Sequence, residues 1–289
     1  MPGSLFKITG MQRVQALFGL WTALVLAFLY LPIALLIIYS FNASRLNIVW
    51  QGFTTHWYHE ILHDHALLSA ALNSLLIAAA VTILSVLLGT LGAWLLYRYR
   101  WPFAGFLRTL VAVPLIMPDV IMGVSLLILF AVVNDWGNNL LDKFGYGDDH
   151  LGLGFTTVII GHVTFCFPFV LIAIHARLVG MDPSLEEAAL DLGATPLRAF
   201  LSVTIPYLRP AIFSGALMAF TLSMDELIVT YFTAGPSSTT LPLKVFGMAR
   251  VGLSPILNAV SALFVTVTTL LVVTIEFTRR RGGAKIREN

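Results

Sequence analysis

The chain has 289 residues, of which 58% are hydrophobic and only 11% are charged, whereas soluble domains usually carry about 25% charged residues. This composition excludes an ordinary soluble domain and predicts an all-α polytopic membrane protein, because helices satisfy their own backbone hydrogen bonds in lipid. The formal net charge is only +2 and no nucleic-acid-binding motif is present, so we expect no nucleic-acid partner.

Six segments are long and apolar enough to cross a membrane as helices, which takes about 20 residues each. We expect them to form one transmembrane domain over residues 1–289, with short loops between the spans. In chain order the predicted spans are residues 17–39, 70–96, 106–133, 155–179, 211–232 and 256–278.

The Lys and Arg residues are unevenly divided between the two sides that six spans define. Of the 17 in the chain, only Arg45, Lys143, Lys244 and Arg250 fall on the side opposite to the termini. Because cytoplasmic loops carry an excess of Lys and Arg, we expect both termini to lie in the cytoplasm.

Histidines occur in the first outer loop and in the fourth predicted span. His56, His59 and His63 would share one face of a helix and could bind zinc, but we favour a short amphipathic outer helix without a metal. His162 and His175 lie in an apolar span, where a histidine more often packs with satisfied polar atoms than binds a ligand. We therefore expect no metal centre and no cofactor.

The third predicted span contains an acidic residue next to two prolines. Asp119 follows Pro114 and Pro118 in the run VPLIMPDVIMG, and the prolines should loosen the helix backbone just before the carboxylate. Ionisable residues inside a membrane are costly to insert and often mark a substrate pathway. Asp119 is therefore a candidate pathway residue.

The longest cytoplasmic loop, residues 180–209, has the local signals of a short helix. Asp182 followed by Pro183 fits a helix N-cap with proline at the first helical position. Ser184 with Glu187 three residues later also fits a capping box. Gly193 is a typical residue just beyond a helix C-terminus.

A second short helix is expected in the same loop, which makes the segment 182–206 a helix–glycine–helix elbow. Thr195 and Pro196 repeat the cap-then-proline start, and the helix should run to about Val203 before the next span. Two short helices are marginal in water unless an apolar face is covered. Either the protein's own helices or another protein could cover the apolar residues, which are Leu190, Leu192, Leu197, Phe200 and Leu201.

The fifth predicted span carries two adjacent acids, Asp225 and Glu226, in the run FTLSMDELIVTYF. At 1.5 Å per residue, Asp119 and Asp225 both lie roughly 20 Å into a membrane core about 30 Å thick. Acids that line a cavity in the membrane without a basic partner favour binding of a cation. The cation could be a proton, a metal ion or an organic polycation. The alternative is that each acid is protonated, caps broken backbone or pairs with an arginine of a partner chain.

The elbow sequence EEAALDLGATPLRAFLSVTIP resembles the EAA loop of permease subunits in binding-protein-dependent ABC importers. The resemblance implies that the loop docks into a groove of a separate cytoplasmic ATPase and transmits its closing. The chain itself has no nucleotide-binding G-x-x-x-x-G-K-[ST] motif, so we expect it not to be an enzyme. The matching positions are Glu187, Ala188, Ala189, Gly193, Ile205, which replaces the commoner leucine, and Pro206.

Several longer stretches resemble the second permease of spermidine/putrescine importers, among them PLIMPDVIMGVSLL and AFTLSMDELIVTYFTAGPSSTTLPLKVF. The resemblance implies a type I importer permease with six transmembrane helices in a bacterial inner membrane, surrounded by membrane lipid. It further implies a heterodimer with a second permease, a cytoplasmic ATPase dimer, a periplasmic substrate-binding protein and a polyamine substrate. The acids at Asp119 and Asp225 suit that cargo, which carries two or more positive charges, and Glu226 is the third candidate pathway residue.

Three other functions remain to be distinguished from polyamine import. A cation-coupled secondary transporter would use the same membrane acids without an ATPase. An intramembrane enzyme would need clustered ligands or a nucleophile with a base at one depth, which the spans do not offer. A permease of the same family could import another small solute.

Overall fold

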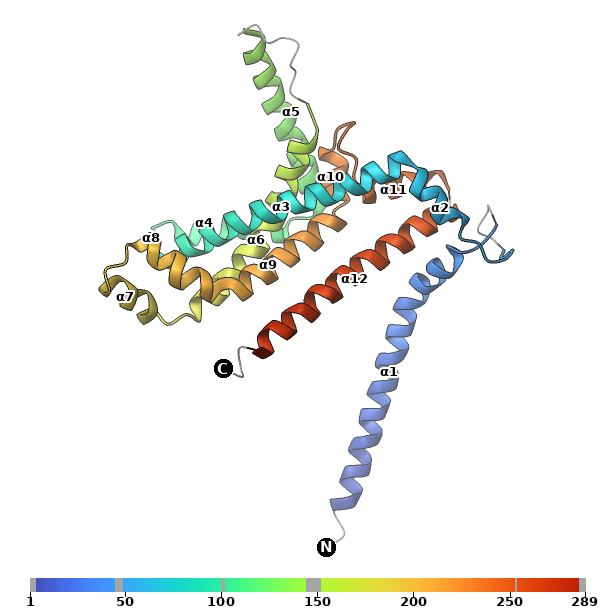
Figure 1. Cartoon of the computed structure of the whole chain (residues 1–289), viewed down its shortest axis with the longest axis horizontal. Helices are drawn as coiled ribbons and strands as arrows, with labels where there is room; N and C mark the ends of the chain where they lie inside the picture. Colours follow the sequence, from blue (N-terminus) through green and yellow to red (C-terminus); the bar gives the residue numbers. More distant parts are fainter. Residues whose placement is uncertain (1–3, 45–48, 100–101, 144–151, 253, 286–289) are drawn as a thin grey trace. The chain divides into compact units, whose positions relative to one another are not determined.

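The computed structural model describes residues 4–44, 49–99, 102–143, 152–252 and 254–285, and these residues are nearly all helical (Figure 1). Within them no β-strand forms, and the only extended pairing is a single bridge between Asn42 and Phe53. The helices are α1 Ser4–Tyr39, α2 His56–His63, α3 His65–Arg98, α4 Ala104–Ile116, α5 Asp119–Lys143, α6 Phe155–Val179, α7 Ser184–Asp191, α8 Pro196–Ala199, the π-helix η1 Phe200–Thr204, α9 Ile205–Asp225, α10 Ile228–Thr233, α11 Leu241–Val251 and α12 Pro255–Lys285.

The predicted all-α membrane architecture is confirmed. Among the described residues, five helical segments are long and apolar enough to cross a membrane, and two shorter apolar helices, Ala104–Ile116 and Pro255–Leu270, accompany them. The five are Val14–Tyr39, His65–Arg98, Asp119–Asn139, Phe155–Val179 and Pro196–Asp225.

The third predicted span is interrupted rather than continuous. Helix α4 ends at Ile116, Met117 is extended with ψ 132°, and α5 begins at Asp119. The proline at 118 lacks an N–H and disfavours helical backbone at the residue before it, which explains the break. The loosening expected from the prolines is therefore a complete interruption, directly before the acidic residue.

The fifth predicted span, residues 211–232, has different limits at both ends. It ends early, because α9 stops at Asp225 and Glu226 takes ψ 110° before α10 begins at Ile228. It starts early, because α8 continues through the π-helix η1 directly into α9. The second elbow helix is therefore not a separate short helix ending near Val203.

The π-helical turn has a local explanation in the proline that follows it. Pro206 has no N–H to donate to the carbonyl of Ser202, so the regular hydrogen-bond ladder cannot pass this point unchanged. The wider turn over Phe200–Thr204 accommodates this gap, and α9 then continues from Ile205.

The chain divides by its contacts into two compact units, residues 1–65 with 247–289 and residues 66–246. In the second unit, α6 is central, with α3 and α9 packed against it around a core of buried side chains. This core includes Ile77 and Val81 of α3, Val158, Val170 and Ile174 of α6, and Leu208 and Ala219 of α9. The single domain over the whole chain remains a prediction.

Small residues set the spacing of these helices. A Cβ added at Gly89 of α3 would lie 2.9 Å from the Cβ of Val170 and 3.0 Å from the backbone nitrogen of Leu171. Gly215 of α9 approaches the same valine, with an added Cβ 3.0 Å from its Cγ1. Such close approach is a common way in which membrane helices pack tightly.

We expect Gly89→Ala to destabilise the protein by about 1–3 kcal/mol, because the backbone of α6 would have to shift to admit a methyl group. Thermal unfolding of the purified protein in detergent measures this effect as a lowered midpoint. Gly105→Ala is the matched control, since an added Cβ there meets nothing within 4 Å. Equal midpoints for the two variants would contradict the packing argument.

Candidate functional site

The first half of the elbow is a short helix held at its start by Asp182. The backbone N–H of Ser184 donates to Asp182 Oδ1 at 3.0 Å, and bonds from the Ser184 backbone and side chain keep the pKa of Asp182 below its usual value. The predicted capping box of Ser184 with Glu187 is wrong, because α7 has Pro183 at its N-cap and no side-chain cap there. Asp182 is already outside the helix and binds the first orphan N–H instead.

Gly193 ends α7 as predicted, with a left-handed φ of +85°. The N–H of Gly193 donates to the carbonyl of Leu190 at 2.9 Å, and the N–H of Ala194 donates to the carbonyl of Ala189 at 3.0 Å. These two bonds form a Schellman motif. The chain then restarts at Thr195, whose Oγ1 accepts from the Arg198 N–H at 3.3 Å, so the predicted cap is confirmed.

The apolar residues of the elbow divide between two environments. Phe200 is 6% exposed and its ring lies 4.7 Å from that of Trp94 in α3, so the protein's own helices cover it. Leu192 is 89% exposed and Leu197 66% exposed. Nothing in the described part of the chain covers these two leucines, which leaves them available to a partner.

Glu186 ties α7 to η1, the turn that leads into α9, a contact that sequence reasoning missed. Its carboxylate accepts a hydrogen bond from the hydroxyl of Thr204, which is fully buried in η1. The motif had directed attention to the neighbouring Glu187, which is exposed together with Ala188, while Ala189, Ile205 and Pro206 are half-buried.

A cavity of about 250 Å³ lies where the elbow meets the end of α3. It is lined by Trp94, Arg98, Tyr99, Glu186, Leu190, Pro196 and Ala199.

The three membrane acids lie at the two interruptions of the spans. Asp119 is the first residue of α5 and is half-buried, whereas Asp225 is the last residue of α9 and is exposed. Glu226 is only 8% exposed, and its Oε1 accepts the backbone N–H of Val229 at 2.9 Å. The Glu226 carboxylate thus caps α10, while those of Asp119 and Asp225 make no hydrogen bond or ion pair with the described residues.

The two interruptions are close in space. Helix α10 packs against α5, and a Cβ added at Gly123 would come within 2.5 Å of the Phe232 ring. Glu226 lies within electrostatic range of both Asp119 and Asp225. The similar depth expected for the acids from the sequence thus corresponds to one region of the fold, and their role stays a prediction.

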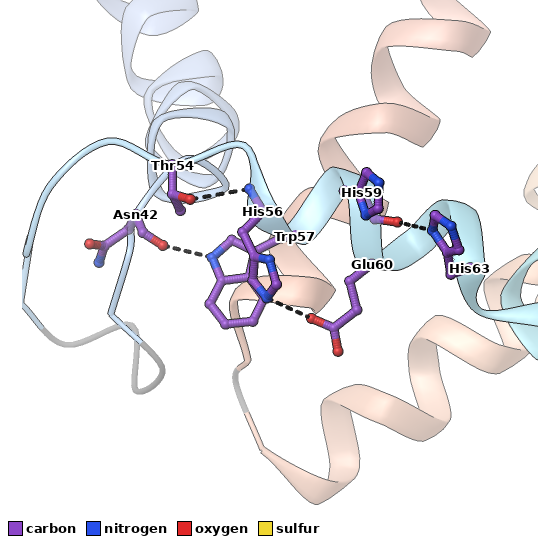
Figure 2. A network of polar contacts seen from close by, with 7 residues as sticks. All are labelled: Asn42, Thr54, His56, Trp57, His59, Glu60 and His63. Carbon is purple, nitrogen blue, oxygen red and sulfur yellow. Dashed lines mark hydrogen bonds and ion pairs between the residues drawn. The ribbon is translucent and has the colours of Figure 1, made fainter.

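The outer histidines lie on the predicted short helix, α2 (Figure 2). His56 Nε2 lies 3.6 Å from Glu60 Oε2, and His63 Nδ1 donates to the carbonyl of His59 at 2.8 Å. Trp57 is buried and its Nε1–H donates to the carbonyl of Asn42 at 2.8 Å, which fastens α2 to the end of α1. Among the described residues, no three potential metal ligands gather at one point.

Comparison with known proteins agrees with this architecture. Residues 85–279 match the family described as binding-protein-dependent transport system inner membrane component. The fold is similar to that of a bacterial ABC transporter involved in the import of the acidic polysaccharide alginate, with a TM-score of 0.77 and 17% identity over 96% of this chain and 98% of that one.

Two curated relatives from Escherichia coli (strain K12) are similar over most of their length. The putrescine transport system permease protein PotI is 45% identical over 237 residues, which are 82% of this chain and 81% of PotI. The spermidine/putrescine transport system permease protein PotC is 38% identical over 255 residues, 88% of this chain and 90% of PotC. The chain therefore belongs to the family of inner membrane components of binding-protein-dependent transport systems, among the permeases related to polyamine importers.

Proposed function

We propose that this chain is a transmembrane permease subunit of an ATP-driven importer for polyamines of the putrescine and spermidine class. The observation that carries the proposal is the 45% identity to a putrescine permease across four fifths of both chains. Asp119 and Asp225, whose carboxylates make no hydrogen bond or ion pair with the described residues, suit a cargo that carries two or more positive charges. Glu226 supports them indirectly, because its carboxylate holds the start of α10.

The assembly that this function requires has three further kinds of component. A second permease completes the pathway as a heterodimer, an ATPase dimer binds in the cytoplasm, and a periplasmic protein delivers the substrate. The exposed Leu192 and Leu197 of the elbow support docking to the ATPase. A related fold has been solved as an alginate transporter in complex with its substrate-bound periplasmic protein.

The chain lies in the bacterial inner membrane with both termini in the cytoplasm, an orientation supported by the uneven distribution of Lys and Arg. Many apolar side chains of α1 are exposed, which suits contact with lipid or with the second permease. In this orientation the elbow faces the cytoplasm.

Transport proceeds by alternating access. ATP binding closes the ATPase dimer, and the elbow at 182–206 moves with it. The helices attached to the elbow then open the substrate pathway to the other side of the membrane. Glu186 and Phe200 transmit this movement, because Glu186 binds α7 to η1 and Phe200 packs against Trp94 of α3. ATP hydrolysis belongs to the partner, so this chain carries no catalytic residue.

Cargo is tested by uptake in cells that lack their own polyamine import and express this chain with its partner permease, ATPase and binding protein. We expect labelled putrescine or spermidine to accumulate, and unlabelled polyamines to compete where thiamine, iron chelates and acidic sugars do not. An assembled complex that takes up none of the polyamines would contradict the cargo assignment.

A further inference from the structure

A buried histidine spans the interruption between α9 and α10. His162 of α6 is fully buried, and its two ring nitrogens contact hydroxyls on opposite sides of the break. Its Nδ1 lies 2.9 Å from Ser223 Oγ near the end of α9, and its Nε2 lies 2.7 Å from Thr230 Oγ1 in α10. One side chain of a third helix thus holds both halves of the interrupted span.

The positions of the protons follow from a second contact of Thr230. Its hydroxyl donates to the carbonyl of Glu226 at 2.9 Å, so its only proton is already used. His162 Nε2 must then carry a hydrogen and donate to Thr230, and Nδ1 of the neutral ring must accept from the hydroxyl of Ser223. A protonated ring would place a charge without a counter-ion among the described residues in a buried site, which is costly.

The same bonds fix the backbone of the break. Thr230 satisfies the Glu226 carbonyl and the Glu226 carboxylate satisfies the Val229 N–H, both of them groups that the interruption would otherwise leave unpaired. With Glu226 turned inward as a cap, the adjacent Asp225 is exposed. The Thr230 hydroxyl thus links His162 to the break at which Glu226 is buried and Asp225 is exposed.

Helix α6 also holds α10 at two points on the N-terminal side of His162. Thr157 Oγ1 donates to the carbonyl of Thr233 at 2.7 Å, and a Cβ at Gly161 would lie 2.9 Å from Val229. At its other end α6 stops at Val179, about 26 Å away along the helix, and the elbow helix α7 begins shortly afterwards. A single helix thus joins the elbow to the acid-bearing break.

We propose that His162 is a positioning residue for transport: it holds α10 to α6, so that movement of the elbow reaches the break and keeps Asp225 presented to the cargo. The inference rests on the proposed function for its transport readout. It assigns His162, Ser223 and Thr230 no contact with the cargo itself.

The test uses the reconstituted complex with its partner permease, ATPase and binding protein. Thr230→Val removes the bridging hydroxyl at nearly constant volume, and His162→Leu removes the bridge from the other side. We expect each to lower polyamine uptake per assembled complex by about tenfold, the size expected when a buried hydrogen-bond partner is removed. ATP hydrolysis stimulated by the binding protein should persist, so that more ATP is consumed per cargo molecule.

Two further variants separate positioning from simple stability. His162→Gln offers one acceptor and one donor at a similar separation and should recover most of the uptake. Thr221→Val is the matched control, because among the described residues its hydroxyl bonds within its own helix, to the carbonyl of Leu217 at 2.8 Å. Parallel loss of uptake, ATP hydrolysis and assembled complex in Thr230→Val would show a merely structural role and overturn the proposal.

A double variant tests whether His162 acts through the acid. In the Asp225→Asn background, Thr230→Val should lower uptake by no more than about twofold further, because coupled residues are not additive. An undiminished tenfold loss in that background would contradict action through Asp225.

Accessibility of position 225 tests the inference without any cargo. Cys166 is the only cysteine and is buried, so Asp225→Cys with Cys166→Ser provides a single reactive thiol for a cationic methanethiosulfonate. Thr230→Val should change the labelling rate by about threefold or more, as expected for a break released from a buried bond, and Thr221→Val should not. Equal rates in all three proteins would overturn the proposal, whereas failed polyamine uptake by the unmodified complex would count against the proposed function alone.

Discussion

Asp225→Asn is expected to lower polyamine uptake by roughly tenfold to a hundredfold at unchanged expression. The carboxylate is exposed at the end of α9 and makes no bond with the described residues, so its charge is available to an ammonium group. A charge-assisted hydrogen bond contributes about 1.5–3 kcal/mol, and about 1.4 kcal/mol corresponds to a tenfold change. Initial uptake rates of labelled putrescine over a range of concentrations measure the effect.

Two companions of this variant show whether the effect comes from the charge at this position. Asp225→Glu keeps the charge and should retain much of the uptake. Asp135→Asn removes an exposed charge further along α5 and should leave uptake unchanged. Unchanged uptake in Asp225→Asn would assign this carboxylate a structural role and leave the permease function standing.

Gly193→Val is expected to uncouple the chain from its ATPase. The residue has φ +85° between the two halves of the elbow, a conformation that costs an L-residue about 1–2 kcal/mol and is particularly unfavourable for a β-branched one. The two Schellman hydrogen bonds at this point fix the angle between α7 and the segment that leads to α8. We expect uptake to fall by roughly tenfold or more. The exposed Leu192, one residue earlier, would no longer face the proposed docking groove of the ATPase.

Measurement of co-purified ATPase together with uptake identifies the cause of that loss. Gly193→Asn is the matched control, since asparagine tolerates the left-handed region better than other side chains, and it should retain most of both signals. Space does not explain the difference, because an added Cβ at this position meets nothing within 4 Å. Full uptake in Gly193→Val would contradict the role of the elbow geometry.

Local rules predicted those parts of the fold whose causes lie within a few residues. The end of α7 at Gly193 and the cap at Thr195 depend on neighbouring backbone groups and were confirmed. The interruption before Asp119 was indicated by Pro118, although its extent was not. Five of the six predicted spans correspond to helices in the described residues that are long and apolar enough to cross a membrane, because each depends on its own length and composition.

Features that depend on distant partners could not be predicted in the same way. The break after Asp225 contains neither proline nor glycine, and it is stabilised by the side chains of Glu226, Thr230 and His162 acting across helices. The bond between Glu186 and Thr204 joins α7 to η1, residues 18 positions apart on the two sides of the turn at Gly193. For the same reason the sequence left open whether Phe200 or Leu192 would be covered.

The most direct measurement of the central proposal is uptake of labelled putrescine into proteoliposomes that contain this chain, its partner permease and the ATPase. The binding protein is supplied outside and ATP is enclosed inside. We predict accumulation only when ATP and a hydrolysis-competent ATPase are both present, with no dependence on an imposed proton gradient. Accumulation driven by a proton gradient without ATP or ATPase would contradict the proposal and identify a cation-coupled secondary transporter.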